Sequence, residues 1–185
     1  MSNYFTIVQY IASASYFLGT LLYLKHIPEL ILNNNNEKLF GYLLLIISFS
    51  ILTYFTYQHA IHDQDKEKES EYNIIGKPSN YAYGLLALYF MLGLLFDYGL
   101  YFRWTYLFPL LGYTLLAIEE VSGIFLVAIF YLISILTTFY FKRLDLSSED
   151  ILLIINKAGL LVYFSVYAVN YTLRTYKNAF KNLFL

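Results

Sequence analysis

The sequence predicts an all-α, polytopic membrane protein with about six transmembrane helices in a single membrane domain, residues 1–185. Two observations carry this prediction. Hydrophobic residues occupy 59% of the 185 positions and charged residues 14%, whereas soluble domains have roughly 45–50% and 25%. The charged residues also gather in short clusters between long apolar runs, and about 20 apolar residues in a helix cross the roughly 30 Å hydrocarbon core.

Six apolar runs qualify as spans. The first begins near Tyr4 without a basic stretch before it or a clear small-residue cleavage site after it, so we expect a retained helix rather than a signal peptide. The charged segment 62–80, which contains "HDQDKEKESEYN", is predicted to be a loop. The predicted spans are 4–26, 39–61, 81–97, 101–118, 122–142 and 150–172.

The third and fourth spans come from one apolar stretch, which runs from Tyr81 to Ile118. A single helix of that length would be nearly twice as long as the hydrocarbon core is thick. We therefore expect the chain to turn back at "FDYGLYFR", with Asp97 and Arg103 among the lipid headgroups. Further along, the basic pair 142–143 ends the fifth span and "LDLSSED" leads to the sixth.

Charge and composition exclude several functions. The formal net charge is -1, so there is no basic patch for nucleic acid, and the absence of cysteine excludes disulfides, thiolate metal sites and cysteine nucleophiles. Lipids are the expected surroundings. Lysine and arginine are divided almost evenly between the two sides, so the positive-inside rule predicts no orientation.

Glu119 and Glu120 stand side by side between two apolar runs. One interpretation is an interfacial turn that needs only water, and the other is a place on a proton path. Lys157 is the one basic residue well inside a predicted span. An ionised lysine in mid-bilayer costs roughly 2.5–3.5 kcal/mol, which makes it a functional candidate. Its long side chain could instead reach the interface. If it stays inside, Glu119 or Glu120 could be its partner.

His59 and His62 lie three residues apart on one helical face and are weak candidates for metal ligands, although interfacial histidines are the more common case. The sequence contains no glycine-rich phosphate loop, no nucleophile and base arrangement and no carboxylate cluster of metal-site spacing. We therefore expect no catalytic residues and no cofactor. The 21 Tyr and 16 Phe are interpreted as lipid-facing and interfacial packing.

From Tyr101 onward the chain resembles a known family. "YFRWTYLFPLLGYTLLAIEEVSGIFLVAIFYLISILTTFYFKRLDLSSED" is similar to the fourth and fifth membrane helices of NADH dehydrogenase subunit 2, an antiporter-like membrane-arm subunit of respiratory complex I. The matching features are "LF" at 107–108, "LLG" at 110–112 with Ala117 five residues on, an acidic turn at 119–120, the basic pair at 142–143 and "SSED" at 147–150. The first 100 residues match the family only in the number of spans.

The resemblance implies a structural, N-terminal part of a longer subunit. The family's proton-path glutamate falls on Phe130 and its lysine on Leu153, so neither charge is kept. Lys157 lies one helical turn beyond Leu153 on the same face, which permits a displaced lysine. Glu120 lies nearly three turns from Phe130 and is a poor substitute. Lys157, Glu119 and Glu120 are the proton-path candidates under this hypothesis.

Two alternatives stay open. "FLGTLLYLKH" and "EKLFGYLLLIISFSILTYFTY" are similar to the first two helices of microbial rhodopsins, although the retinal-binding lysine of that family would lie in a seventh helix beyond the six predicted here. A small free-standing channel or carrier would need polar residues along a path. The candidates for such a path are few: Thr6, Gln9, Ser13 and Asn170.

The sequence therefore predicts a non-catalytic membrane subunit of NADH:ubiquinone oxidoreductase, packed against other membrane subunits of a large complex. The abundance of Tyr, Phe and Asn is typical of an A/T-rich, organelle-encoded gene, which favours the mitochondrial inner membrane as its location.

Overall fold

The computed structural model of the chain describes residues 2–62, 77–96, 103–142 and 145–183. All regular structure in these ranges is helical. The elements are α1 (Ser2–Leu24), α2 (Ile27–Leu32), α3 (Asn36–His62), α4 (Lys77–Phe96), the 3₁₀-helix η1 (Arg103–Tyr106), α5 (Leu107–Ala117), α6 (Gly123–Lys142) and α7 (Ser148–Leu183).

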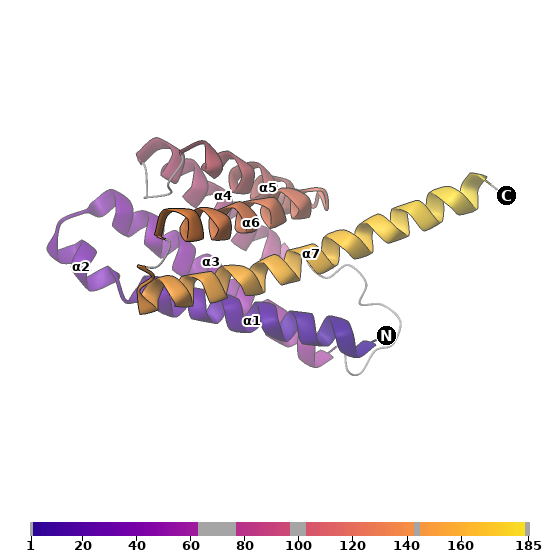
Figure 1. Cartoon of the computed structure of the whole chain (residues 1–185), viewed down its shortest axis with the longest axis horizontal. Helices are drawn as coiled ribbons and strands as arrows, with labels where there is room; N and C mark the ends of the chain where they lie inside the picture. The colour runs from indigo at the N-terminus through magenta and orange to yellow at the C-terminus, as the bar shows by residue number, and fades with distance from the viewer. Residues whose placement is uncertain (1, 63–76, 97–102, 143–144, 184–185) are drawn as a thin grey trace.

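Six of the helices pack in a closed ring, and they run along one common long axis (Figure 1). Helices α1, α3, α4, α5, α6 and α7 each pack against their neighbours in the chain, and α7 packs against α1. Successive helices run in opposite directions, so the two termini lie at the same end of the bundle. The short α2 lies at the opposite end, between α1 and α3.

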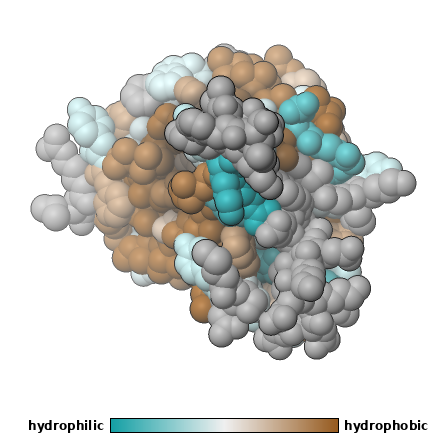
Figure 2. Space-filling view, turned by 90° about the vertical axis from the view of Figure 1, so that its right-hand side faces the viewer, coloured by the Kyte–Doolittle hydropathy of each residue, from teal (hydrophilic) through white to brown (hydrophobic). Residues whose placement is uncertain are grey.

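Five helical stretches are long and apolar enough to cross a membrane: Tyr4–Leu32, Asn36–Ile61, Ser79–Phe96, Gly123–Lys142 and Ser148–Lys177. Their outward faces carry large apolar side chains such as Phe17, Tyr54 and Leu136, each more than half exposed. Figure 2 shows the end of the bundle that carries the termini, with one flank of the molecule largely hydrophobic. The chain is an integral, polytopic, all-α membrane protein, as the sequence predicts.

The described part of the fourth predicted span, 101–118, is shorter than a full membrane crossing. This part is η1, of 4 residues, followed by α5, of 11 residues. Together they extend about 24 Å, less than the roughly 30 Å of hydrocarbon. They nevertheless complete the ring, because α5 packs between α4 and α6. The expected headgroup residue Asp97 lies outside the described residues.

Two other boundaries differ from the predicted spans. Helix α4 begins at Lys77, inside the predicted loop 62–80, and proline at its second residue, Pro78, suits a helix start because the first turn needs no N–H partner. Helix α7 has 36 residues and passes well beyond 172. Its length of about 54 Å carries its last part out of the bundle (Figure 1).

The start of α7 is fixed by a capping box. Ser147 Oγ accepts a hydrogen bond from Asp150 N (3.1 Å), and Asp150 Oδ2 accepts hydrogen bonds from Ser147 N (3.0 Å) and Ser147 Oγ (2.6 Å). Lys142, the last residue of α6, donates to Asp150 Oδ1 at 2.5 Å. The "SSED" motif therefore opens a helix, as expected, and ties it to the end of α6.

Glycines allow close contacts around the ring. A Cβ at Gly123 would overlap the carbonyl oxygen of Gly112, which brings α5 and α6 together. A Cβ at Gly159 of α7 would overlap Ser15 Oγ of α1, and one at Gly93 of α4 would lie 2.5 Å from the Tyr106 ring. Close backbone approach matters here because helices in lipid gain little from burying apolar surface against one another.

We expect Gly123→Ala to destabilise the protein, although alanine is the better helix former. The added methyl group meets a backbone atom of α5, so the two helices must separate, at a cost of about 1–3 kcal/mol for overpacking. Thermal unfolding in detergent, followed by circular dichroism, measures the change. Gly84→Ala is the control, because its Cβ would lie 3.9 Å from Ala117 Cβ. A Gly123→Ala variant as stable as the wild type would contradict the expectation.

Candidate functional site

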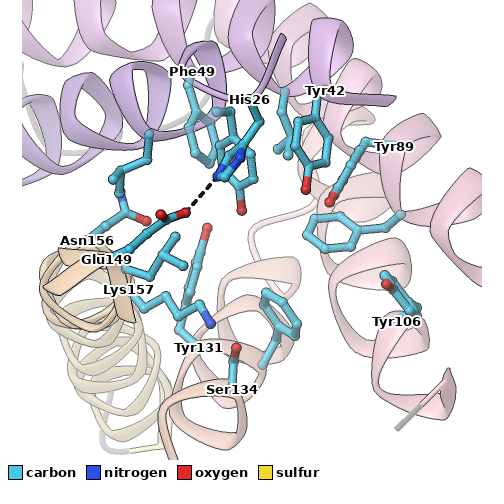
Figure 3. Close-up of a pocket in the computed structure, with 16 residues that line it drawn as sticks. His26, Tyr42, Phe49, Tyr89, Tyr106, Tyr131, Ser134, Glu149, Asn156 and Lys157 are labelled. Carbon is cyan, nitrogen blue, oxygen red and sulfur yellow. Dashed lines mark hydrogen bonds and ion pairs between the residues drawn. The ribbon is translucent and has the colours of Figure 1, made fainter. Parts of the chain in front are cut away.

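A cavity of about 260 Å³ lies inside the ring, at the end of the bundle where α2 and the start of α7 are found (Figure 3). Helices α1, α3, α4, α6 and α7 and η1 all contribute to its wall. Apolar side chains such as Phe49, Phe90 and Leu153 form part of this wall. The polar residues of the wall inside the ring are Tyr23, Tyr42, Tyr89, Tyr106, Tyr131, Ser134, Asn156 and Lys157.

Lys157 gives the cavity its positive charge. It lies nine residues into α7, about 13 Å from the start of the helix. Its partly buried side chain lies in the wall of the cavity, and Figure 3 shows the ammonium turned into the same space as Ser134. Within the described ranges no ion pair or hydrogen bond involves Lys157. The sequence allowed a side chain that stays inside the bundle or one that reaches the interface. The structure shows the side chain inside the bundle.

Asn156 fixes the helix turn that carries Lys157. Its side chain is 4% exposed, and Nδ2 donates a hydrogen bond to the carbonyl oxygen of Ser15 in α1. The contact is close because α1 has Gly19 here, whose Cβ would lie 2.9 Å from the same nitrogen. This bond holds α7 against α1 and sets the direction in which Lys157 points.

An ion cluster lies at the rim of the cavity. Glu149, in the first turn of α7, accepts a hydrogen bond from Lys25 Nζ at 2.9 Å. Its other oxygen lies 2.6 Å from His26 Nε2, the contact dashed in Figure 3. Both partners follow the end of α1. The cluster links the residues after α1 to the start of α7. Because the carboxylate of Glu149 is paired with Lys25, its charge is balanced at the rim. Lys157 is therefore the charged group that decides which ligands suit the cavity.

Tyrosine hydroxyls are the part of the site that the sequence interpretation missed. It assigned the tyrosines to lipid and interface, yet Tyr106 is 1% exposed and Tyr131 4%. Tyr131 OH lies 2.7 Å from Tyr113 OH, deeper in the ring. A signal was present in the spacing: Tyr16 and Tyr23 of α1, like Tyr106 and Tyr113, lie seven residues apart, which places each pair on one helix face.

Glu119 and Glu120 lie at the other end of the bundle, in the turn between α5 and α6, and both are exposed. Glu120 N donates to the carbonyl oxygen of Leu115 (2.8 Å) and Glu119 N to that of Leu116 (3.2 Å). With Glu119 at φ 69°, this is a Schellman turn, whose left-handed position usually holds glycine. Glu119 also accepts a hydrogen bond from Asn80 Nδ2 (2.9 Å). Neither glutamate lines the cavity that contains Lys157.

Two further positions of the cavity wall are those on which the resemblance to NADH dehydrogenase subunit 2 would place that family's two charges. Phe130 of α6 and Leu153 of α7 both form part of its wall, together with Lys157. The structure therefore places a lysine one turn from Leu153 in the same space.

The remaining candidates lie apart from the cavity. Among the described residues no three of His, Cys, Asp and Glu come together as metal ligands, and of the pair His59 and His62 the second has a side chain outside the described part. The polar residues considered for a channel path differ from one another in burial. Thr6, Gln9 and Ser13 are buried on the inner face of α1, whereas Asn170 is partly exposed.

The fold and the cavity define an integral membrane protein of the polytopic all-α class, with a polar internal cavity closed by a ring of helices. Comparison of the chain with protein families, with curated proteins and with solved structures finds no match.

We expect a cysteine introduced at Ser134 to react with a charged, membrane-impermeant thiol reagent. Reaction needs the thiolate, which forms in the polar cavity and not in hydrocarbon. The natural chain has no cysteine, so it is a clean background. Leu132→Cys is the control, because Leu132 lies at nearly the same depth but is 47% exposed on the outer face of α6. Equal labelling of the two variants in intact membranes would show that the cavity is not open to water.

Proposed function

We propose that this protein binds a small anionic solute in the cavity, as the binding step of a membrane carrier or receptor. The observation that carries the proposal is the ammonium group of Lys157, held inside a ring of helices in a cavity of about 260 Å³. An ionised lysine costs free energy in a membrane, and a bound anion offsets that cost. The charge therefore favours anions over cations.

The volume of the cavity limits the size of the solute. One water molecule occupies about 30 Å³ in the liquid, so the space suits an inorganic anion or a carboxylate of a few heavy atoms. The residues Tyr42, Tyr131 and Ser134 line the cavity, and their hydroxyls can donate hydrogen bonds to the oxygen atoms of a bound anion. Packed tyrosines and phenylalanines fill the ring beyond the cavity, so the arrangement is that of a binding site open at one end and not of an open channel.

We expect the purified chain in detergent to bind acetate or inorganic phosphate, with Lys157→Met at least about tenfold weaker, a loss of about 1.4 kcal/mol or more. Removal of the ammonium group leaves the hydroxyls but no counter-charge. Isothermal titration calorimetry measures the affinity. Lys177→Met is the matched control, because Lys177 lies on the same helix and is exposed. Equal affinities of the two variants, or no heat with either anion, would contradict the proposal.

A second candidate keeps the resemblance to NADH dehydrogenase subunit 2. Under it the chain is a structural subunit of respiratory complex I in the mitochondrial inner membrane, and Lys157 has a residual part in proton translocation. One observation favours it: Phe130 and Leu153, the positions of the family's two charges, line the same cavity as Lys157. Glu119 and Glu120 lie too far along the bundle to share in such a path, and serve the turn between α5 and α6.

A native gel of a mild-detergent membrane extract tests this candidate. If the chain is a complex I subunit, it migrates with the band that stains for NADH dehydrogenase activity, where mass spectrometry detects it. Lys157→Met then lowers proton pumping by the assembled complex. Migration as a small separate species would rule out the complex I candidate and leave the binding protein.

A further inference from the structure

The cavity that contains Lys157 has a largely aromatic wall. Among the described residues that line it, half are phenylalanine or tyrosine and three more are leucines. Tyr23 and Tyr42 pack edge to face with their ring centroids 5.1 Å apart, and Phe90 and Phe130 do the same at 5.2 Å. The first pair comes from α1 and α3 and the second from α4 and α6. Rings from four helices therefore surround the space.

The charges of the wall suit a ligand with a single negative charge. Lys157 is the only lysine or arginine among the described residues that line the cavity. At the rim, Glu149 is paired with Lys25 at 2.9 Å and contacts His26 at 2.6 Å. A second negative charge on the ligand would meet no second cation inside the cavity and would face the Glu149 carboxylate at its rim. Burying such an unpaired charge is costly.

The ammonium group and the rings lie on different sides of the space. Figure 3 shows Lys157 and Ser134 together on one side, with Tyr42 and Tyr89 on the other. A carboxylate that pairs with Lys157 and accepts a hydrogen bond from Ser134 would point the rest of its molecule towards the rings. An inorganic anion would leave the surface of these rings in water. An apolar body would cover it, and a flat ring could add edge-to-face contacts.

The volume of the cavity sets the size of that body. At about 30 Å³ for each water molecule, the cavity of about 260 Å³ holds roughly eight water molecules. A carboxylate group replaces about two of them, which leaves space for a six-membered ring. The tail of a long-chain fatty acid is too large for the space that remains.

Given anion binding at Lys157, on which this inference rests, we propose that the cavity selects a monocarboxylate with a flat apolar body. Benzoate is the simplest aromatic member of this class. The carboxylate lies against Lys157 and Ser134, and the ring lies among the aromatic side chains of α1, α3, α4 and α6. The lysine thus selects for charge, and the aromatic wall selects against inorganic anions.

Isothermal titration calorimetry of the purified full-length chain in detergent tests the proposal with four probes: benzoate, acetate, inorganic phosphate and benzyl alcohol. Titrations into detergent alone are subtracted. We expect benzoate to bind at least about tenfold more tightly than acetate, because its ring leaves water for the aromatic wall. Phosphate should bind more weakly than benzoate as well. Benzyl alcohol has the ring without the charge, so it should also bind more weakly than benzoate.

A pair of neighbouring residues on α7 provides the variants. Leu153→Phe enlarges a side chain of the cavity wall, so the ratio of benzoate to acetate affinity should fall towards one. Leu152→Phe is the matched control, because Leu152 is 40% exposed and does not line the cavity, and it should keep the wild-type ratio. If Leu153→Phe does not fold, the four probes on the wild type decide by themselves.

The outcomes separate this inference from the proposed function. Acetate or phosphate binding as tightly as benzoate would overturn the selection for an apolar body and leave anion binding at Lys157 in place. Benzyl alcohol binding as tightly as benzoate would overturn the role of the carboxylate. Binding of none of the anions would overturn both the inference and the proposed function.

Discussion

The contact between α1 and α7 is the constraint on which the rest of the structure depends. These are the first and last long helices of the ring, so their contact alone converts a row of helices into a closed bundle. It is made of a glycine at 159 against Ser15, the bond from Asn156 to the Ser15 carbonyl, and the pairing of Lys25 and His26 with Glu149. Since lipid provides little drive for helix association, small residues and polar bonds hold the closure. The cavity exists because the ring is closed.

Most of the fold could be predicted from the sequence, because hydrocarbon thickness sets the length of a span. The spans before residue 97 and after residue 122 were found to within a few residues, although two helix ends moved. Lys77 and Pro78 were assigned to a loop on their polarity, while the helix starts there. The long α7 was cut short because polarity after 172 resembles a loop, whereas a helix can continue in water. The short α5 shows that an apolar run can complete a bundle without having the length of a full span.

The candidate site was only partly predictable. Lys157 was recognisable because a charge within an apolar run is costly and therefore rare. Its surroundings were not, since Ser134, Tyr42 and Glu149 reach the cavity from three helices whose order around the ring is fixed only by tertiary packing. Exposed tyrosines such as Tyr54 and Tyr140 lie on the outer surface as predicted, but the buried ones were misassigned. Composition does not distinguish a tyrosine at an interface from one whose hydroxyl lies within a bundle. Glu119 and Glu120 attracted attention by their charge, yet the structure places both in the turn between α5 and α6.

The length of α7 connects the inside of the bundle with a part of the helix that projects past its neighbours. One unbroken helix of 36 residues holds Asn156 and Lys157 near one end and carries the basic residues 174 and 177 on the part that projects past its neighbours (Figure 1). Because a helix is stiff along its axis, a tilt of the projecting part also moves the opposite end of α7, which forms part of the cavity wall. A contact made on the projecting part can thus change the shape of the cavity without touching it.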